Sequence, residues 1–504
     1  MKHRRYQKSL DRQEERVLPP RVEDYVSENN PVRAIDSYVD TLNLEDLGFK
    51  YTTFVVHAGQ PPFNPVALLK LYLYGYIQHI HSSRKLAREA QRNLEVIWLM
   101  RGNHPCYKVI SDFRKDNCTV IKSVNRDFIM LCKELSLFGG EEVAVDGSFF
   151  NGDTNKSRIY TKKNLNKQIG AIEKKITEYQ KAIDEQDMTD DKAGYGALSE
   201  DEDLHKKLKR LQERQAEKKG LQKQLQDSGE TQISMVDKEA RLLTKRGQTI
   251  AGFNVQIAVD SKYHLIVAND VVQDGNDSQQ LAPMLEKAQE ILKSGNLAGL
   301  ADTGYYNGTQ LKLCEEQGIE AYVPIPKKSK EGQEEGKEPH FTSEDFTYDA
   351  EQDCYHCPQE KKITRYGRKL RHLRDKNYVS YKSKRAICNE CPLRERCLTE
   401  KSNHKEILRW EHSEVYVRHQ KRMETRPDNA RQRGALVEHP FGTLKHRAGM
   451  HHFLMRGLEK CRGEFSLMVL GYNFTRVLNT LGVDALRDYC VQRTENELKN
   501  GQYA

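Results

Sequence analysis

Three acidic residues, far apart in the chain, have surroundings that suit metal-assisted chemistry. Asp146 ends a short β-branched run before a glycine, Asp302 ends a second apolar run, and Glu438 lies in a predicted helix downstream. Carboxylates that converge at a sheet edge repel one another unless a cation lies between them. Oxygen ligands suit Mg²⁺ or Mn²⁺, and two such ions about 4 Å apart would support in-line phosphoryl transfer. The joint pattern carries this hypothesis, because a single Asp after a strand is more often a cap or turn residue.

Other acids and histidines offer weaker alternatives. Asp260 and Asp274 lie near predicted strands and rival Asp302, although Asp260 precedes Ser-Lys and indicates a hairpin turn. His439 adjoins Glu438, and we expect it to help position the helix. The adjacent His451 and His452 diverge on a helix, so we do not expect them to share a metal.

Five of the eleven cysteines form a cluster in the C-terminal half: Cys354, Cys357, Cys388, Cys391 and Cys397. Two CxxC pairs about 30 residues apart are typical of a closed, structural zinc site. We therefore predict Zn²⁺ bound by Cys354, Cys357, Cys388 and Cys391, with Cys397 as an alternative ligand and with His356 and His404 as further options. The alternative is a set of reduced, free thiols.

Positive charge is concentrated between the two CxxC pairs. The net charge of the chain is a mild +8, yet residues 361–385 hold eleven Lys and Arg against one acid, Asp375. Such a run attracts phosphates. The alternative is a solvated basic face.

The elements that must position these residues follow from hydrophobic patterning. With 504 residues, the chain predicts about three domains. Residues 1–135 predict short helices, one starting at Pro65 and one capped by Ser82. Beyond them, strands and helices alternate, which indicates an α/β sheet with mixed strands. Residues 163–228 carry apolar residues at spacings of three and four and predict an antiparallel coiled-coil hairpin.

Composition excludes other classes of protein. Hydrophobic residues make up 37% of the chain, enough for a core, but no apolar run approaches the roughly 18 residues of a membrane span. The first residues lack the apolar stretch of a secretory signal. We expect a cytoplasmic, nucleoid-associated protein with no membrane partner.

Several motifs together resemble those of the DDE-type transposases of bacterial insertion sequences. PxxLLKLYLYGY with SSRKL resembles the family's N-terminal domain, VAVDGSFF its first-Asp strand and LADTGYYNG its second-Asp strand. AGFNVQIAVDSKYHLIVANDVVQDGNDSQQLAPML resembles the central block, and VEHPFGTLKHRAG resembles the Glu helix. The last motif places Lys445 after Glu438 with six residues between them, as in the family's Tyr-Arg-Glu-Lys signature.

The resemblance implies a ribonuclease-H-like fold and a role for each matched residue. Asp146, Asp302 and Glu438 would be the catalytic, metal-binding acids. Arg433 and Lys445 would contact DNA phosphates, although Lys445 could instead be a solvated helix lysine. Arg433 lies five residues before Glu438, and Ala430 stands where the signature has its tyrosine.

The expected organisation has six segments: an N-terminal helical DNA-binding domain (1–135), the first part of the core (136–162), the coiled-coil hairpin (163–228), the second part of the core (229–326), a basic Cys-rich insert (327–425) and the C-terminal part of the core with the Glu helix (426–504). The expected function is a DNA transposase, homodimeric on DNA, that binds terminal inverted repeats, cleaves with divalent metal ions and joins 3′-hydroxyl ends to target DNA. The alternatives are a metal-dependent nuclease without strand transfer and a zinc-dependent DNA-binding regulator with an inactive core.

Overall fold

The computed structural model describes residues 21–50, 52, 62–190, 198–245, 247–326, 340–342, 345–373, 376–399 and 402–501, without the side chains of 184–190, 198–204 and 497–501. The chain divides into two compact units. The first comprises Met1–Asp277, Lys287–Ser294 and Gly434–Ala504, and the second comprises Ser278–Glu286 and Gly295–Arg433. In the described part of the chain, every helix is too short or too polar to cross a membrane.

Short helices form the N-terminal region of the first unit, as predicted. Their bounds are η1 (Val22–Tyr25), α1 (Pro31–Asp40), α2 (Pro65–Ile77), α3 (Ser83–Arg92), α4 (Leu94–Leu99), α5 (Tyr107–Asn117) and α6 (Ile121–Glu134). The start of α2 at Pro65 is confirmed, and Asn64 caps it by accepting from the Val66 N–H. Ser82 is the residue before α3, but its hydroxyl makes no capping hydrogen bond.

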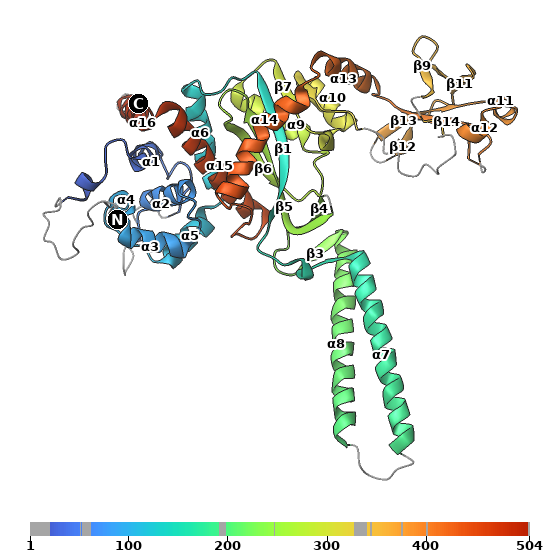
Figure 1. The fold of residues 1–504 in the computed structure, drawn as a ribbon, viewed down its shortest axis with the longest axis horizontal. Helices are drawn as coiled ribbons and strands as arrows, with labels where there is room; N and C mark the ends of the chain where they lie inside the picture. Colours follow the sequence, from blue (N-terminus) through green and yellow to red (C-terminus); the bar gives the residue numbers. More distant parts are fainter. Residues whose placement is uncertain are drawn as a thin grey trace, which may run out of the picture. The chain divides into compact units, whose positions relative to one another are not determined.

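Four antiparallel strands, which are part of a larger mixed sheet, lie in the first unit (Figure 1). Strand β1 (Glu142–Asn151) pairs with β5 (Gln248–Asp260), and β5 also pairs with β4 (Arg241–Lys245) and β6 (Ile266–Val272). The β5–β6 hairpin confirms the predicted one. The expectation that the first strand ends at Asp146 is wrong, because pairing with β5 continues to Asn151 and leaves Asp146 in the middle of β1.

One long apolar helix, α15 (Leu458–Leu481), packs against β6, α2 and α6. Its Phe465 ring lies 5.7 Å from the ring of Phe150 on β1, so the helix and the sheet share one aromatic core. Helix α16 (Val483–Gly501) follows and contacts α1. The strongly apolar residues 464–481 all lie within α15, which begins six residues before them.

Two long helices, α7 (Lys162–Asp190) and α8 (Leu198–Ser228), lie side by side in Figure 1 and extend from the ribbon formed by β2 (Ile159–Thr161) and β3 (Gln232–Ser234). Gln222 donates to the Asn166 side chain at 2.6 Å, and Gln215 donates to Glu173 at 3.0 Å. This register is antiparallel. At the base, the buried residues are Tyr160, Leu165, Leu221 and Leu225.

The second unit combines an α/β part with an all-antiparallel sheet. Strands β7 (Leu297–Leu300) and β8 (Ile319–Tyr322) are parallel, and α10 (Gly308–Glu316) connects them. Helix α9 (Leu281–Leu292) precedes them, and α13 (Glu414–Thr425) contacts α10 and β8. The mixed α/β class with a helical N-terminal region is thus confirmed, while the ribonuclease-H-like arrangement stays a prediction.

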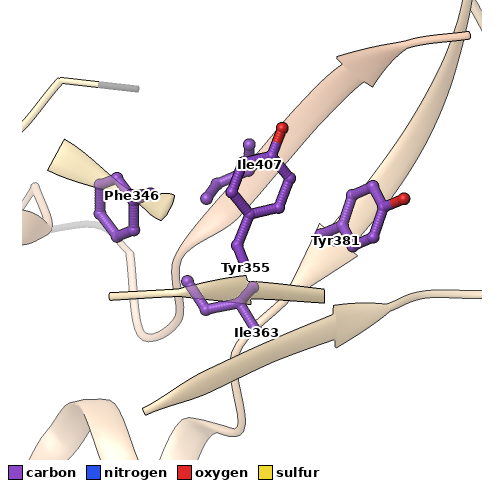
Figure 2. Close-up of a cluster of buried hydrophobic side chains, with 5 residues drawn as sticks. All are labelled: Phe346, Tyr355, Ile363, Tyr381 and Ile407. Carbon is purple, nitrogen blue, oxygen red and sulfur yellow. The ribbon is translucent and has the colours of Figure 1, made fainter. Parts of the chain in front are cut away.

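The Cys-rich part of the second unit has a sheet of its own. Its strands are β9 (Thr347–Asp349), β10 (Cys354–His356), β11 (Lys362–Arg365), β12 (Arg371–Leu373), β13 (Lys376–Lys382) and β14 (Glu406–Trp410). Two short helices, α11 (Arg385–Asn389) and α12 (Arg394–Cys397), lie between β13 and β14 in the chain. A small core holds it together: Phe346, Tyr355, Ile363, Tyr381 and Ile407 (Figure 2). Arg374 and Asp375 of the basic run lie outside the described residues.

Candidate active site

Asp146 lies half-buried on β1, opposite Ile257 of β5. Its carboxylate accepts a hydrogen bond from the Gly147 N–H at 2.8 Å. Strand pairing on both sides of Asp146 fixes the backbone, so the direction of this carboxylate is set by the sheet and not by a loop.

A buried polar network lies against the neighbouring Gly147. The amides of Asn254 and Gln256 on β5 both donate to the Asp277 Oδ1 at 2.8 Å. Asn254 and Gln256 are fully buried and Asp277 is 6% exposed. A Cβ at Gly147 would lie 2.3 Å from the Gln256 Nε2 and 2.5 Å from Asp277, so only glycine fits there.

Sequence reasoning did not assign a role to these three network residues. The alternation of apolar and polar residues over 252–260 is typical of a strand with one apolar and one polar face. Polar residues at 254 and 256 in a strand that is buried on both faces are an unusual signal, because buried amides need internal partners. Their burial could not be known before the fold.

Lys445 contacts the same strand, although it is about 300 positions away in the sequence. It lies in the π-helical segment Thr443–Arg447 and donates to the Ser148 hydroxyl at 2.5 Å and the Phe149 carbonyl at 2.8 Å. Burial, assisted by the positive charge of Lys245, lowers the pKa of Lys445 to about 8, while the negative charge of Asp146 opposes that shift. Lys445 is therefore not a freely solvated helix lysine.

The lowered pKa of Lys445 predicts a pH-dependent contribution to stability. The unfolded lysine keeps its proton up to about pH 10.4. Between pH 8 and 10 the unfolded state therefore binds more protons than the folded state, so stability rises with pH, by at most about 1.4 kcal/mol per pH unit before solvent screening reduces it. We expect the unfolding free energy of the wild type, relative to Lys445→Met, to increase from pH 7 to pH 9.5 in urea titrations.

A matched control separates this effect from general alkaline behaviour. Lys115 is exposed on α5, so Lys115→Met should leave the pH dependence unchanged. A gap between wild type and Lys445→Met that is constant over the pH range would contradict the prediction.

Glu438 is exposed on α14 (Asn429–Gly442), next to the buried Leu436 and Val437. Its neighbour His439 turns toward α15, where its Nδ1 lies 3.0 Å from the Tyr472 hydroxyl. Burial lowers the pKa of His439, with Arg476 adding to the shift. His439 therefore fixes α14 on α15 and leaves Glu438 facing solvent, in line with the positioning role expected for it.

Asp302 belongs to the second unit. It follows β7 and caps the 3₁₀-helix Thr303–Tyr305, where its carboxylate accepts from the Gly304 N–H at 2.8 Å. Asp146 and Glu438 belong to the first unit, while Arg433 is half-buried at the edge of the second. The convergence of the three acids thus stays a prediction.

The rival acid Asp260 has a structural role. It is fully buried and accepts from the backbone N–H groups of Gly139, Gly140 and Lys262 at 2.9–3.1 Å. Asp274 is exposed in the loop before α9. His451 and His452 are exposed, and their backbone pairs with Asn151 at the end of β1.

The cysteines divide into two groups that differ from the predicted ligand set. Cys357, Cys388, Cys391 and Cys397 line one cavity of about 330 Å³. Cys354 is buried in β10 and is not among the lining residues; its sulfur lies 3.8 Å from the His356 Nε2. In the described part of the chain, Cys354, His356 and Asp349 are the one group of three or more such residues with ligand atoms all within 4.8 Å of one another.

Two family models match the chain. A transposase domain (DUF772) matches residues 20–116, and a transposase DDE domain matches residues 356–478. Both matched stretches are therefore similar to domains of transposases. This confirms the resemblance to DDE-type transposases. The DDE-domain match begins in the Cys-rich segment and continues past Glu438 and Lys445. We expected the Cys-rich segment to be an insert and the Glu helix to belong to the core, but one family model matches both.

Solved structures add a distant likeness. The transposase-like chain is similar to a piggyBac transposase in a cryo-EM structure of a synaptic complex with hairpin DNA, with 8% identity, 94% of this chain and 82% of that chain covered, and a TM-score of 0.29. A score this low does not support a shared fold. Among curated proteins, none matches the chain.

Proposed function

We propose that this protein is a DNA transposase of the DDE type, which binds the terminal inverted repeats of an insertion sequence, cleaves DNA and joins 3′-hydroxyl ends to target DNA. The observation that most supports this proposal is the contact of Lys445 with Ser148 and Phe149, directly after Asp146. Two residues that the family resemblance singles out are neighbours in the first unit, although nothing in the local sequence requires it.

Asp146, Asp302 and Glu438 would bind two divalent metal ions. Their carboxylate oxygens are the donors that Mg²⁺ prefers, and Asp146 and Asp302 are only half-buried and Glu438 exposed, so ions and waters can reach them. When bound, the ions would activate the attacking oxygen and stabilise the leaving one. The protein's own contribution is to hold Asp146 rigidly on β1 and to place the Lys445 ammonium beside it, where it can pair with a DNA phosphate.

DNA would be held by basic surfaces outside this site. A surface cavity of about 590 Å³ at the starts of α3 and α5 is lined by Arg84, Lys85, Lys108 and Arg114, within the DUF772 match. In the second unit, the basic run 361–385 includes the strands β11, β12 and β13, of which β12 is exposed along its whole length. Such surfaces neutralise phosphates irrespective of base sequence.

The test is cleavage of DNA that contains the element's ends. Wild-type protein with Mg²⁺ should cut the end and join it to a target. Glu438→Gln should reduce the cleavage rate more than about 100-fold. Mutating a residue that only hydrogen-bonds to a metal ligand typically costs about 10–100-fold in activity, and loss of the ligand itself should cost more. Both proteins should bind the end equally in gel-shift assays, and sedimentation of the complex should show two copies of the chain.

The outcomes separate the alternatives. Cutting without joining of precut ends would favour a nuclease, and binding with no cutting by the wild type would favour a regulator. Equal cleavage by wild type and Glu438→Gln would reject the assigned role of Glu438.

A further inference from the structure

Four thiols in the Cys-rich sheet surround one cavity. Cys357 directly follows β10, Cys388 lies in α11, Cys391 in the turn after it, and Cys397 ends α12. All four are free and partly exposed, whereas Cys354 is buried. Sulfur atoms from residues up to 40 positions apart, from Cys357 to Cys397, therefore line the same cavity.

The four thiols interact electrostatically. Burial raises the pKa of Cys397; the charge of Lys405 opposes the rise, and the thiols of Cys388, Cys391 and Cys357 add to it. Thiolates that line one cavity repel one another, and a divalent cation between them removes that repulsion.

Two of the four sulfurs have hydrogen-bond partners that hold them in place. The Lys361 N–H points to the Cys357 sulfur at 3.3 Å, and the Ser383 hydroxyl lies 3.0 Å from the Cys388 sulfur. The turn from Cys357 to Lys361 is closed by Glu360 N–H to Cys357 carbonyl and Cys357 N–H to Lys361 carbonyl bonds. Such contacts orient the ligands around a metal.

Strand geometry explains why Cys354 is not among the four. Alternate residues of a strand face opposite sides, so residues three apart such as Cys354 and Cys357 point to opposite faces. Tyr355 and Cys357 lie on the side of the small core, and Cys397 packs against that core as well. Cys354 lies on the other side, beside His356 and Asp349.

We propose that Cys357, Cys388, Cys391 and Cys397 bind one Zn²⁺ that stabilises the fold of the Cys-rich sheet. Four cysteine sulfurs form the closed, tetrahedral set that zinc takes in structural sites. The five-residue core of Figure 2 is small for a six-stranded sheet, and segments of this kind often depend on a metal for their folding. No three of the four sulfurs lie within 4.8 Å of one another, so the ion would draw α11 and α12 toward the end of β10.

The full-length protein tests this assignment without any DNA. Native mass spectrometry after addition of ZnCl₂ and removal of excess metal should show one zinc per chain in the wild type and in Cys354→Ser, and none in Cys397→Ser. Thermal unfolding with and without a chelator should show a fall in the melting temperature of the wild type and of Cys354→Ser. The pair is matched because each variant removes one sulfur from the same small sheet.

A mutation-free measurement covers the case in which Cys397→Ser does not fold. Thiols of the wild type are alkylated with and without zinc, and peptide mapping identifies those that the metal protects. Protection of Cys357, Cys388, Cys391 and Cys397, with Cys354 unchanged, supports the proposal. Absence of zinc from the wild type, loss of zinc in Cys354→Ser with retention in Cys397→Ser, or disulfides among the four would overturn it.

Discussion

Replacing Glu464 with alanine should lower the unfolding free energy of the first unit by about 3–5 kcal/mol. Glu464 is 1% exposed on α15, and its carboxylate accepts from the backbone N–H groups of Leu454 and Met455 at 3.0–3.1 Å. Burial raises its pKa, and the nearby Arg114, itself buried, opposes that rise. The alanine leaves the two buried N–H groups without their acceptor. It also removes the negative charge that lies near the buried Arg114, and both changes are costly in the interior of a protein.

The measurement can be confined to the first unit. The chain has two tryptophans, Trp98 in the first unit and Trp410 in the second. In a Trp410→Phe background, urea unfolding followed by Trp98 fluorescence reports on the first unit alone. Glu459 lies on the same helix but is exposed and pairs with Lys122 and Arg462, so Glu459→Ala should cost about 0–1 kcal/mol. Equal losses for the two alanine variants would contradict the prediction.

Asp277→Ala is expected to cost about 2–6 kcal/mol and to reduce DNA cleavage. Asn254 and Gln256 would each lose one buried hydrogen bond, at about 1–3 kcal/mol for each donor left unpaired. Because the Gln256 amide lies against Gly147, its rearrangement would shift the strand next to Asp146. The effect on cleavage depends on the proposed function, whereas the effect on stability does not.

Two variants calibrate this result. Asp277→Asn keeps an oxygen at the position that accepts both amides and should cost clearly less than the alanine. Glu290→Ala, on an exposed residue of α9 within the first unit, should change stability by no more than about 0.5 kcal/mol. A loss of stability for Asp277→Ala no larger than that for Glu290→Ala would rule out the network as a support of β1.

Local patterns predicted the elements well and their contacts poorly. The start of α2 at Pro65 and the β5–β6 hairpin follow from capping and alternation, which depend on a few neighbouring residues. The position of Asp146 inside β1 was missed, because the length of that strand is set by its pairing with β5. The Lys445 contact with β1 and the burial of Asn254 were not predictable, since they arise only when distant segments pack.

The cysteine cluster also shows that spacing in the sequence does not determine which side chains lie together. Spacing alone grouped Cys354 with Cys357, because the CxxC pattern is the usual zinc signature. That grouping assumes a turn between the two residues, whereas the structure has a strand over Cys354–His356. Whether Cys354 lies beside Cys357 therefore depends on the conformation of residues 354–356, which form a strand and not a turn.

The paired helices α7 and α8 have 29 and 31 residues, which gives each a length of about 45 Å. They leave the rest of the first unit through the short β2–β3 ribbon, and their base is fastened where the Lys218 ammonium donates to the Tyr160 hydroxyl at 2.9 Å. The described cross-helix hydrogen bonds, Gln222 to Asn166 and Gln215 to Glu173, join only the two helices. Adding or removing seven residues from both helices would therefore change the length of this arm in steps of about 10 Å. The length of the arm is thus independent of the strand that holds Asp146.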